Sequence, residues 1–398
     1  MIRRQSFYIV GVLLIILGFS MLFSVGCSLI YGDGDLIPLL QSIAVTITSG
    51  LILVIFFKSK DKKDLSTHDG FAVVTLGWIA IVIFSAFPFY FSGTLDYTNS
   101  FFEAMSGLTT TGATVLGHSS TLLIEDVPHG ILFWRSFTQF IGGMGIIVFS
   151  IAILPMLGMG GVQLFRAEVA GPVADKITPR VKQTAKLLWG IYVGFVLILC
   201  LILKIEGMSW FDAICHSFTT IATSGFSTKN ISIAAYGGLI QWTIIIFMFL
   251  AATNFSLHYY FIAKGKFEYY KDHEFRVYFG LCIIFSILFF INIVGTNKYQ
   301  TDLLSFRHSV FAAVSILTTT GFSTENFNEW PEMSKMLLFF LFFIGGSAGS
   351  TTGGMKIIRS ILVVKYLLYE VRKLLHPKGV FNITIGENTI DDNVVRAT

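Results

Sequence analysis

The sequence predicts an all-α polytopic membrane protein, with a leading helix hairpin followed by repeated units of span, half-helix, turn and span. Composition is the first observation: 54% of the 398 residues are hydrophobic and 13% are charged, about half the charged share of a soluble domain. The second is a set of eight apolar runs, each long enough to cross a bilayer. The third is a Thr/Ser-Gly turn that occurs at 109–112, 222–225 and 318–321, which indicates copies of one unit around an axis.

The apolar runs define the elements in chain order. Runs 6–30 and 36–57 predict the hairpin, and the first is too long for the core of a signal peptide, so we expect it to remain as a span. The other long runs are 70–91, 131–155, 187–205, 239–263, 276–295 and 334–364. Three shorter runs, 98–110, 208–221 and 303–318, each lie just before one turn. They are too short to cross the bilayer and therefore predict re-entrant half-helices.

Basic residues set the expected orientation of these spans. With the N-terminus in the cytoplasm, 22 of the 28 Lys and Arg residues fall in the inner segments 1–5, 58–69, 156–186, 264–276 and 356–398. An excess of Lys and Arg on the cytoplasmic side is the usual bias of membrane proteins. The bias predicts a multi-pass protein with all three turns in the outer half of the membrane.

The three turns have the chemistry of a cation filter. Glycine adopts positive φ readily, so its carbonyl can turn toward an axis, and a ring of such carbonyls replaces the water shell of a cation. The C-terminal end of each half-helix carries about half a negative charge, which also favours a cation. Non-helical backbone at membrane depth is tolerated where it is buried in protein or lines a water-filled path. The turns therefore predict a pseudo-symmetric cation pore, although a Thr-Thr-Gly sequence that only caps a helix is the alternative.

The residue types of the turns favour K⁺ as the transported ion. No acidic residue lies within them, whereas Ca²⁺ sites generally use carboxylates. The Thr hydroxyls either brace the turns or form a lower coordinating ring. No tightly bound cofactor is expected. The predicted K⁺-binding positions are Thr110, Thr111, Gly112, Thr223, Ser224, Gly225, Thr319, Thr320 and Gly321.

A Gly-rich stretch, residues 345–354, interrupts the last span and is called the gate loop below. Five of its ten residues are Gly, a poor composition for a continuous helix. We expect a flexible barrier beneath the filter; a tight helix crossing is the alternative. The predicted gate residues are Gly345, Gly346, Gly349, Gly353, Gly354 and Lys356. Lys356 and Arg359 either screen cations and hold the loop, or are ordinary basic anchors on the inner side.

The remaining polar residues have weaker signals. Acidic residues near the turns are expected to cap helices, and concentrating cations at the pore mouth is the alternative; they are Glu103, Asp212 and Glu325. Arg135 is expected to extend toward the membrane surface, with a position near the pore mouth as the alternative. His216 and His308 are expected to be hydrogen-bonded within half-helices, with proton transfer as the alternative. Packing is the expected role of Gly142, Gly143 and Gly145, and of the four cysteines. The chain has no nucleotide-binding, zinc-protease or nucleophile motif, so nothing predicts an enzyme.

Four stretches resemble one known family. They are Phe102–Thr114, Gly142–Val148, Ile153–Gly158 with Gln163–Glu168, and Gly345–Lys356. On these residues the chain resembles the Trk/Ktr/HKT superfamily of potassium transporters, and within it the bacterial Trk-type pore subunits. The resemblance implies K⁺ uptake across the inner membrane by a homodimer, filter glycines at Gly112, Gly225 and Gly321, and gating by the loop 345–354. It also implies a docked ring of cytosolic NAD/ATP-binding regulatory subunits. Gly112 favours K⁺, because members with Ser there resemble Na⁺ carriers.

Five segments of the chain are expected as domains, in agreement with the resemblance. They are an N-terminal transmembrane hairpin at 1–66, pore units at 67–182, 183–270 and 271–374, and a cytoplasmic linker at 375–398. The family has four pore units, so about 80–100 further residues are expected by the repeat length, either lost by truncation or supplied by another chain. Two alternative functions follow: a non-conducting fragment with at most an assembly role, and a Na⁺-permeable carrier. Lipid is the expected surrounding, and no nucleic-acid partner is expected.

Overall fold

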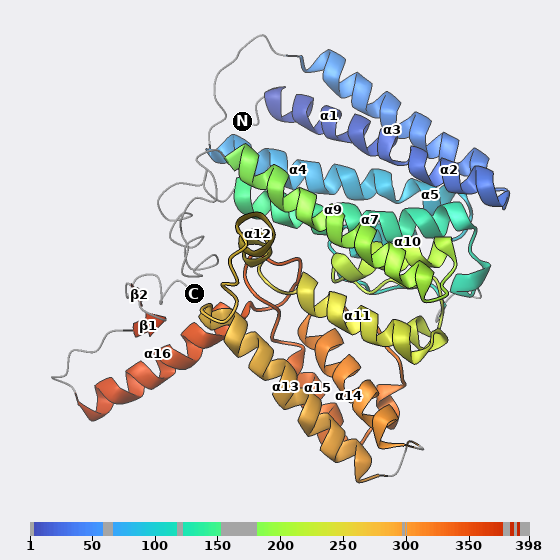
Figure 1. Ribbon diagram of the computed structural model, residues 1–398. Coiled ribbons are helices and arrows are strands. Elements are labelled where there is room, and N and C mark those ends of the chain that lie inside the picture. Colours follow the sequence, from blue (N-terminus) through green and yellow to red (C-terminus); the bar gives the residue numbers. More distant parts are fainter. Residues whose placement is uncertain are drawn as a thin grey trace. The chain divides into compact units, whose positions relative to one another are not determined.

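The computed structural model describes residues 4–58, 67–117, 122–152, 181–296, 299, 301–376, 383–385 and 388–390. These residues are predominantly helical (Figure 1) and divide into two compact units. Unit 1 contains residues 1–142, 214–219 and 226–230, and unit 2 contains residues 143–213, 220–225 and 231–398. The predicted stretches Ile153–Gly158 and Gln163–Glu168 lie outside the described residues.

Unit 1 is built on the leading hairpin and the first half-helix. Its helices are α1 (Arg4–Ser20), α2 (Leu22–Tyr31), α3 (Leu36–Phe56), α4 (Thr67–Ser85), α5 (Phe87–Phe91), α6 (Tyr97–Leu108), η1 (Ile124–Asp126) and the first part of α7 (His129–Ala152). Helices α1 and α3 pack along their lengths (Figure 1). A Cβ on Gly11 would lie 2.8 Å from the Gly50 carbonyl oxygen, so the two backbones cross at a distance that only glycine permits.

Unit 2 holds the remaining helices and the short strands. The helices are the second part of α7, α9 (Val181–Ile205), the two ends of α10 (Trp210–Ile221, whose residues 214–219 belong to unit 1), η3 (Ser232–Ala235), α11 (Gly238–Ala251), α12 (Phe255–Lys264), α13 (His273–Val294), α14 (Asp302–Leu317), η4 (Phe327–Glu329), α15 (Glu332–Leu341) and α16 (Ile357–Leu375). Helices α13, α14 and α15 contact one another and form the orange group in Figure 1. Strands β1 (Ile383–Ile385) and β2 (Asn388–Ile390) pair antiparallel.

Five helices of the described part are long and apolar enough to cross a membrane: Arg4–Tyr31, Leu36–Phe56, Gly70–Phe91, Lys186–Ile205 and His273–Val294. They match five of the eight predicted spans. The run 131–155 is helical as α7 up to Ala152. The last run is divided between α15 and α16, with the predicted gate loop between them. The three predicted half-helices are α6, α10 and α14, of 12, 12 and 16 residues.

The prediction of one continuous span over 239–263 is wrong. Helices α11 and α12 meet there at 96°, across a break of three residues. The side chain of Asn254 caps α12 by accepting a hydrogen bond from the Ser256 N–H at 2.8 Å, so a new helix begins where the run was expected to continue. The break frees backbone carbonyls at the end of α11, and these need other partners.

The predicted linker 375–398 contains the hairpin β1–β2, which the sequence did not predict. Ile383 of β1 is 4% exposed and packs in a cluster with Ala348 of the gate loop and with Ile358 and Leu362 of α16. The Lys365 ammonium donates a hydrogen bond to the Thr384 carbonyl oxygen. This end of the described chain is therefore tied to α16 beside the gate loop.

Candidate filter and gate

The three turns share one unusual backbone conformation. Thr110, Thr223 and Thr319 have φ values of 56°, 51° and 55°, and the glycines two residues later, Gly112, Gly225 and Gly321, have 76°, 76° and 80°. Positive φ is a genuine outlier for a β-branched residue, and it costs on the order of 1–3 kcal/mol. The described chain contains four non-glycine residues with positive φ, and three of them are these threonines. Strain repeated at one position of three copies makes these turns the candidate functional site.

Hydrogen bonds brace each turn against its own half-helix. The N–H of Thr111 donates to the Ser106 carbonyl, and the N–H of Thr320 donates to the Ser315 carbonyl, both at 2.9 Å. The hydroxyls of Thr109 and Thr111 lie 2.8 Å apart, and so do those of Thr318 and Thr320. The second turn has Ala222 and Ser224 at these positions. In the first and third turns, at least, these threonine hydroxyls brace the turn.

The structure brings the second and third turns together within unit 2. A Cβ on Gly225 would lie 2.0 Å from the Thr320 carbonyl oxygen and 3.0 Å from its carbon. The backbones therefore approach at a distance that no side chain can occupy. The first turn, Thr109–Gly112, belongs to unit 1.

A buried ion pair lies behind the first turn. Glu103 and Arg135 are 0% and 1% exposed, and Arg135 Nε lies 2.6 Å from Glu103 Oε1. Glu103 also accepts hydrogen bonds from the Thr114 hydroxyl at 2.8 Å and the Val115 N–H at 3.1 Å. The predictions for both charged residues are wrong: Asp96, not Glu103, caps α6, and Arg135 does not extend toward the membrane surface. Each charge is buried because the other compensates it.

Arg135 connects this pair to the segment after the second turn, which also belongs to unit 1. Its guanidinium carbon lies 3.7 Å from the centre of the Phe226 ring, a cation–π contact. Its Nη1 donates to the Ser227 carbonyl oxygen at 2.8 Å. The Phe226 N–H donates to the Gln139 side-chain oxygen at 3.2 Å. Charged and polar groups of α6 and α7 thus fix the backbone around both segments.

In the second half-helix, His216 occupies the position that corresponds to Glu103 in the first. Glu103 and His216 each lie nine residues before the turn glycine, and each bonds a hydroxyl two residues after it, on Thr114 and Ser227. His308 bonds the Thr324 hydroxyl at 2.9 Å. The prediction that both histidines are hydrogen-bonded in half-helices is confirmed. Asp212 exchanges hydrogen bonds with Ser209 at the start of α10, as expected of a capping residue.

Substitution of Glu103 by glutamine should destabilise the protein strongly. Glutamine leaves the buried Arg135 charge uncompensated, which typically costs about 3–5 kcal/mol. We expect a clear drop in the thermal unfolding midpoint of detergent-solubilised protein, partly recovered in the double variant Glu103→Gln/Arg135→Gln. The matched control is Glu332→Gln, because the Glu332–Lys335 pair is exposed and such pairs contribute little. Equal midpoints for Glu103→Gln and Glu332→Gln would contradict this prediction.

The gate loop is hydrogen-bonded directly to the second and third turns, all within unit 2. The Gly353 N–H donates to the Thr319 hydroxyl at 2.8 Å. The Thr351 hydroxyl donates to the Ile221 carbonyl at 3.0 Å and lies 3.2 Å from the Thr223 hydroxyl. Thr319 and Thr223 are the strained residues of their turns, so the loop contacts the two turns at corresponding positions.

The loop also satisfies the groups that the α11–α12 break exposes. The Ser347 N–H donates to the Ala252 carbonyl at 2.9 Å, and the Thr351 hydroxyl lies 3.3 Å from the Ala251 carbonyl. In return the Phe255 N–H, at the start of α12, donates to the Gly349 carbonyl at 3.1 Å. Two irregular, buried segments thus provide each other's partners, as burial away from water requires.

Glycine is needed at particular places in this loop. A Cβ on Gly345 would lie 2.1 Å from the Gly353 carbonyl oxygen, and a Cβ on Gly346 would lie 2.8 Å from the Ala252 carbonyl oxygen. Gly349 and Gly354 have φ values of 70° and 66°. Lys356 Nζ donates to the Thr352 hydroxyl at 3.0 Å and to its carbonyl. Lys356 therefore holds the end of the loop.

Of the three glycines expected to pack, Gly142 and Gly143 lie in close helix contacts, whereas a Cβ on Gly145 would have no atom within 4 Å. A Cβ on Gly142 would lie 2.2 Å from the Leu108 carbonyl oxygen, so α7 crosses the end of α6 closely. A Cβ on Gly143 would lie 3.0 Å from Ala222. The expected packing role of both glycines is confirmed. Among the described residues, no group of three or more His, Cys, Asp or Glu residues is placed to hold a metal ion.

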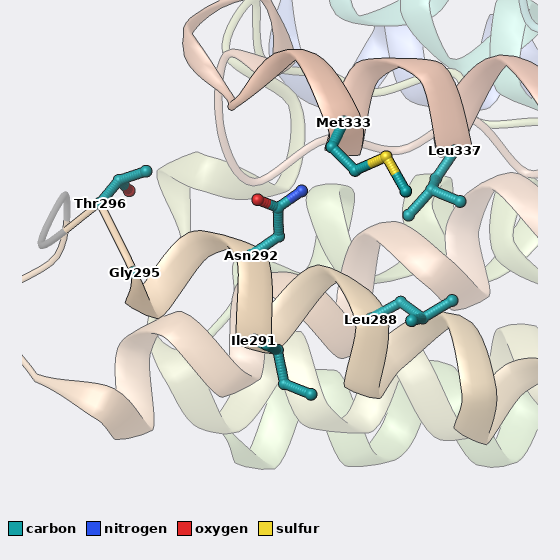
Figure 2. Close-up of a pocket in the computed structure, with 7 residues that line it drawn as sticks. All are labelled: Leu288, Ile291, Asn292, Gly295, Thr296, Met333 and Leu337. Atoms are coloured by element: carbon teal, nitrogen blue, oxygen red, sulfur yellow. The ribbon is translucent and has the colours of Figure 1, made fainter.

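One pocket lies away from the filter and the gate, between the end of α13 and α15. Figure 2 shows Asn292 directed toward Met333 and Leu337, with Leu288 beside it. The lining is mainly apolar, and Asn292 Nδ2 has no hydrogen-bond partner among the described residues. None of the predicted site residues lines this pocket.

Known proteins match most of this chain in both sequence and structure. The family model TrkH, described as a cation transport protein, matches residues 39–398. The Trk system potassium uptake protein TrkH of Vibrio parahaemolyticus is 39% identical over 99% of this chain and 81% of its own length. TrkG of Escherichia coli is 36% identical over 85% of this chain and 70% of its own length. The crystal structure of the potassium transporter TrkH from Vibrio parahaemolyticus aligns with a TM-score of 0.88 at 36% identity, covering 99% of this chain and 81% of that chain.

Proposed function

This chain belongs to the TrkH family of cation transport proteins, and we propose that it takes up K⁺ across the inner membrane through a filter of backbone carbonyls. The observation that carries the proposal is the repeated backbone of the three turns, with a strained Thr and a positive-φ Gly in each. The related TrkH and TrkG proteins are named potassium uptake proteins. Their names support K⁺ as the ion.

The proposed ion-binding groups are the backbone oxygens of the predicted filter residues, namely Thr110 to Gly112, Thr223 to Gly225 and Thr319 to Gly321. Neutral oxygens replace the hydration shell of a weakly hydrated monovalent cation. The membrane potential supplies about 2.3 kcal/mol per charge per 100 mV, which is sufficient for accumulation without a coupled ion. Na⁺ is the alternative cargo, because the same oxygens can bind it.

The gate loop is proposed as the barrier below this filter. Its hydrogen bonds to Thr319, Thr223 and Ile221 support a docked, closed position within unit 2. We further propose the wider assembly that the family resemblance implies: a homodimer with a cytoplasmic N-terminus, surrounded by lipid, with NAD/ATP-binding regulatory subunits on the inner face. The domain boundaries at 66, 182, 270 and 374 belong to the same proposal.

Uptake by cells tests the proposed function. Expression in a bacterial strain that lacks its own K⁺ uptake systems should restore growth at low external K⁺ and give saturable ⁸⁶Rb⁺ uptake, with excess K⁺ competing and excess Na⁺ not. Purified protein in vesicles should show the same preference for K⁺ over Na⁺ under an imposed membrane potential. Competition by Na⁺ equal to that by K⁺ would identify a Na⁺-permeable carrier. No flux from protein present in the membrane in normal amount would identify a non-conducting chain.

A further inference from the structure

Glu274 is a buried carboxylate that the filter chemistry does not use. It lies in the first turn of α13 and is 3% exposed. Its Oε1 accepts two backbone hydrogen bonds, from the Ala348 N–H at 2.9 Å and from the Ile358 N–H at 3.0 Å. A buried carboxylate is costly unless such donors compensate it. One oxygen thus joins three elements: α13, the gate loop and the start of α16.

The two donors flank the part of the gate loop that contacts the filter. Ala348 comes before Thr351 and Gly353, and Ile358 comes after them. Both donor residues are buried, at 1% and 0% exposed. Because α13 is a long helix with its own packing against α14 and α15, it is a rigid base for both ends of the loop. Fixing both ends restricts the positions open to the segment between them.

We propose that Glu274 is a positioning residue that clamps the gate loop against the second and third turns. The inference rests on the proposed gating function of the loop and adds the group that restrains it. Without the clamp, the loop loses two buried hydrogen bonds and leaves its docked position more often. Ion flux should then rise, whereas the preference for K⁺ over Na⁺, which depends on the turns, should stay the same.

A thiol reporter tests the clamp independently of transport. Ser347 is 1% exposed, and its hydroxyl has no partner among the described residues, so Ser347→Cys places a small buried thiol in the loop. In the Ser347→Cys background, Glu274→Leu should speed reaction with a water-soluble maleimide by about tenfold or more, because two buried hydrogen bonds are lost. Glu274→Gln should react at close to the background rate, because its amide oxygen can accept both bonds.

The matched control is Glu206→Leu in the same background. Glu206 is a glutamate of unit 2 that is only partly buried, and it accepts its hydrogen bond from the Thr243 hydroxyl at 2.6 Å rather than from the loop. This variant should leave the labelling rate near the background value. Glu274→Leu without Ser347→Cys measures the reaction of the native cysteines, for subtraction.

The flux measurement completes the test. Glu274→Leu should raise ⁸⁶Rb⁺ flux several-fold with K⁺ competition and Na⁺ exclusion unchanged, and Glu274→Gln should be near parental. A misfolded variant would instead show lower flux and a lower amount of protein in the membrane, whereas loss of the clamp should raise the flux. Unchanged labelling in Glu274→Leu, or equal acceleration in Glu206→Leu, would overturn the clamp. If the parental protein conducts no ion, the proposed function fails, while the labelling rates still decide whether Glu274 holds the loop.

Discussion

Alanine in place of Gly225 should abolish selective K⁺ transport. Two independent effects act at this residue: its φ is 76°, which alanine adopts only with strain, and its new Cβ would lie 2.0 Å from the Thr320 carbonyl oxygen. The clashing atom is backbone of the neighbouring turn, so no side-chain rotation relieves it. We expect the second and third turns to separate, with ⁸⁶Rb⁺ uptake falling by at least about tenfold and Na⁺ competing with what remains.

Two other glycines separate these effects. Gly321 has a φ of 80° but no atom within 4 Å of a new Cβ, and Gly237 has a φ of −65° with equally open space. Gly321→Ala should therefore suffer strain alone and lose less uptake than Gly225→Ala, while Gly237→Ala should transport like the parent. Membrane content and the elution profile of each variant control for folding. Parental ion selectivity in Gly225→Ala would show that the approach of these two turns is not part of the filter.

Sequence reasoning located the repeated elements because their signals are local. A short apolar run, a Thr/Ser-Gly turn and a long apolar run follow one another in the chain, and α6, α10 and α14 lie where these lengths predict. The Gly-rich composition of 345–354 likewise predicted an interruption of the last span. In each of these segments, the local sequence determines whether a regular, hydrogen-bonded helix forms or is interrupted.

Contacts between residues that are far apart in the chain could not be predicted from local sequence signals. Glu103 and Arg135 are 32 residues apart in the sequence. Each residue alone is typical of a helix end or of a membrane surface. Both can be buried because they form an ion pair with each other. Glu274 at the start of an apolar run is typical of an acidic first turn, and its partners lie more than 70 residues later. Positive φ at three threonines opposes their intrinsic preference, so tertiary packing must impose it.

The α11–α12 break shows why local signals fail where two irregular segments compensate each other. The run 239–263 contains no proline, and Asn254, whose side chain caps α12, is followed by another apolar stretch rather than by a recognisable end of the run. The freed carbonyls of Ala251 and Ala252 are tolerable because Thr351 and Ser347 reach them. Each segment supplies hydrogen-bond partners for backbone groups of the other, so the break and the gate loop form one structural feature.

Alanine in place of Gly345 should therefore release the gate loop. The new Cβ would lie 2.1 Å from the Gly353 carbonyl oxygen and 3.3 Å from the Gly354 carbon. Both atoms are backbone of the returning strand of the loop, which also holds the parallel bridge between Ile344 and Met355. Because Gly353 is the residue that donates to Thr319, moving it away breaks the contact with the third turn. We expect ⁸⁶Rb⁺ flux to rise several-fold while K⁺ remains preferred over Na⁺.

Two further glycines of the loop make this a graded series. Gly349 has a φ of 70°, and its new Cβ would meet Asn254 Oδ1 at 3.0 Å, a side-chain atom. Gly353 lacks positive φ, and the nearest atom to its Cβ would be the Thr319 hydroxyl at 3.7 Å. Flux should therefore increase from Gly353→Ala through Gly349→Ala to Gly345→Ala, measured at equal membrane content. The variants differ in the severity of the clash and, at Gly349, in the added strain of positive φ. Equal flux in all three would therefore contradict a barrier held by this backbone contact.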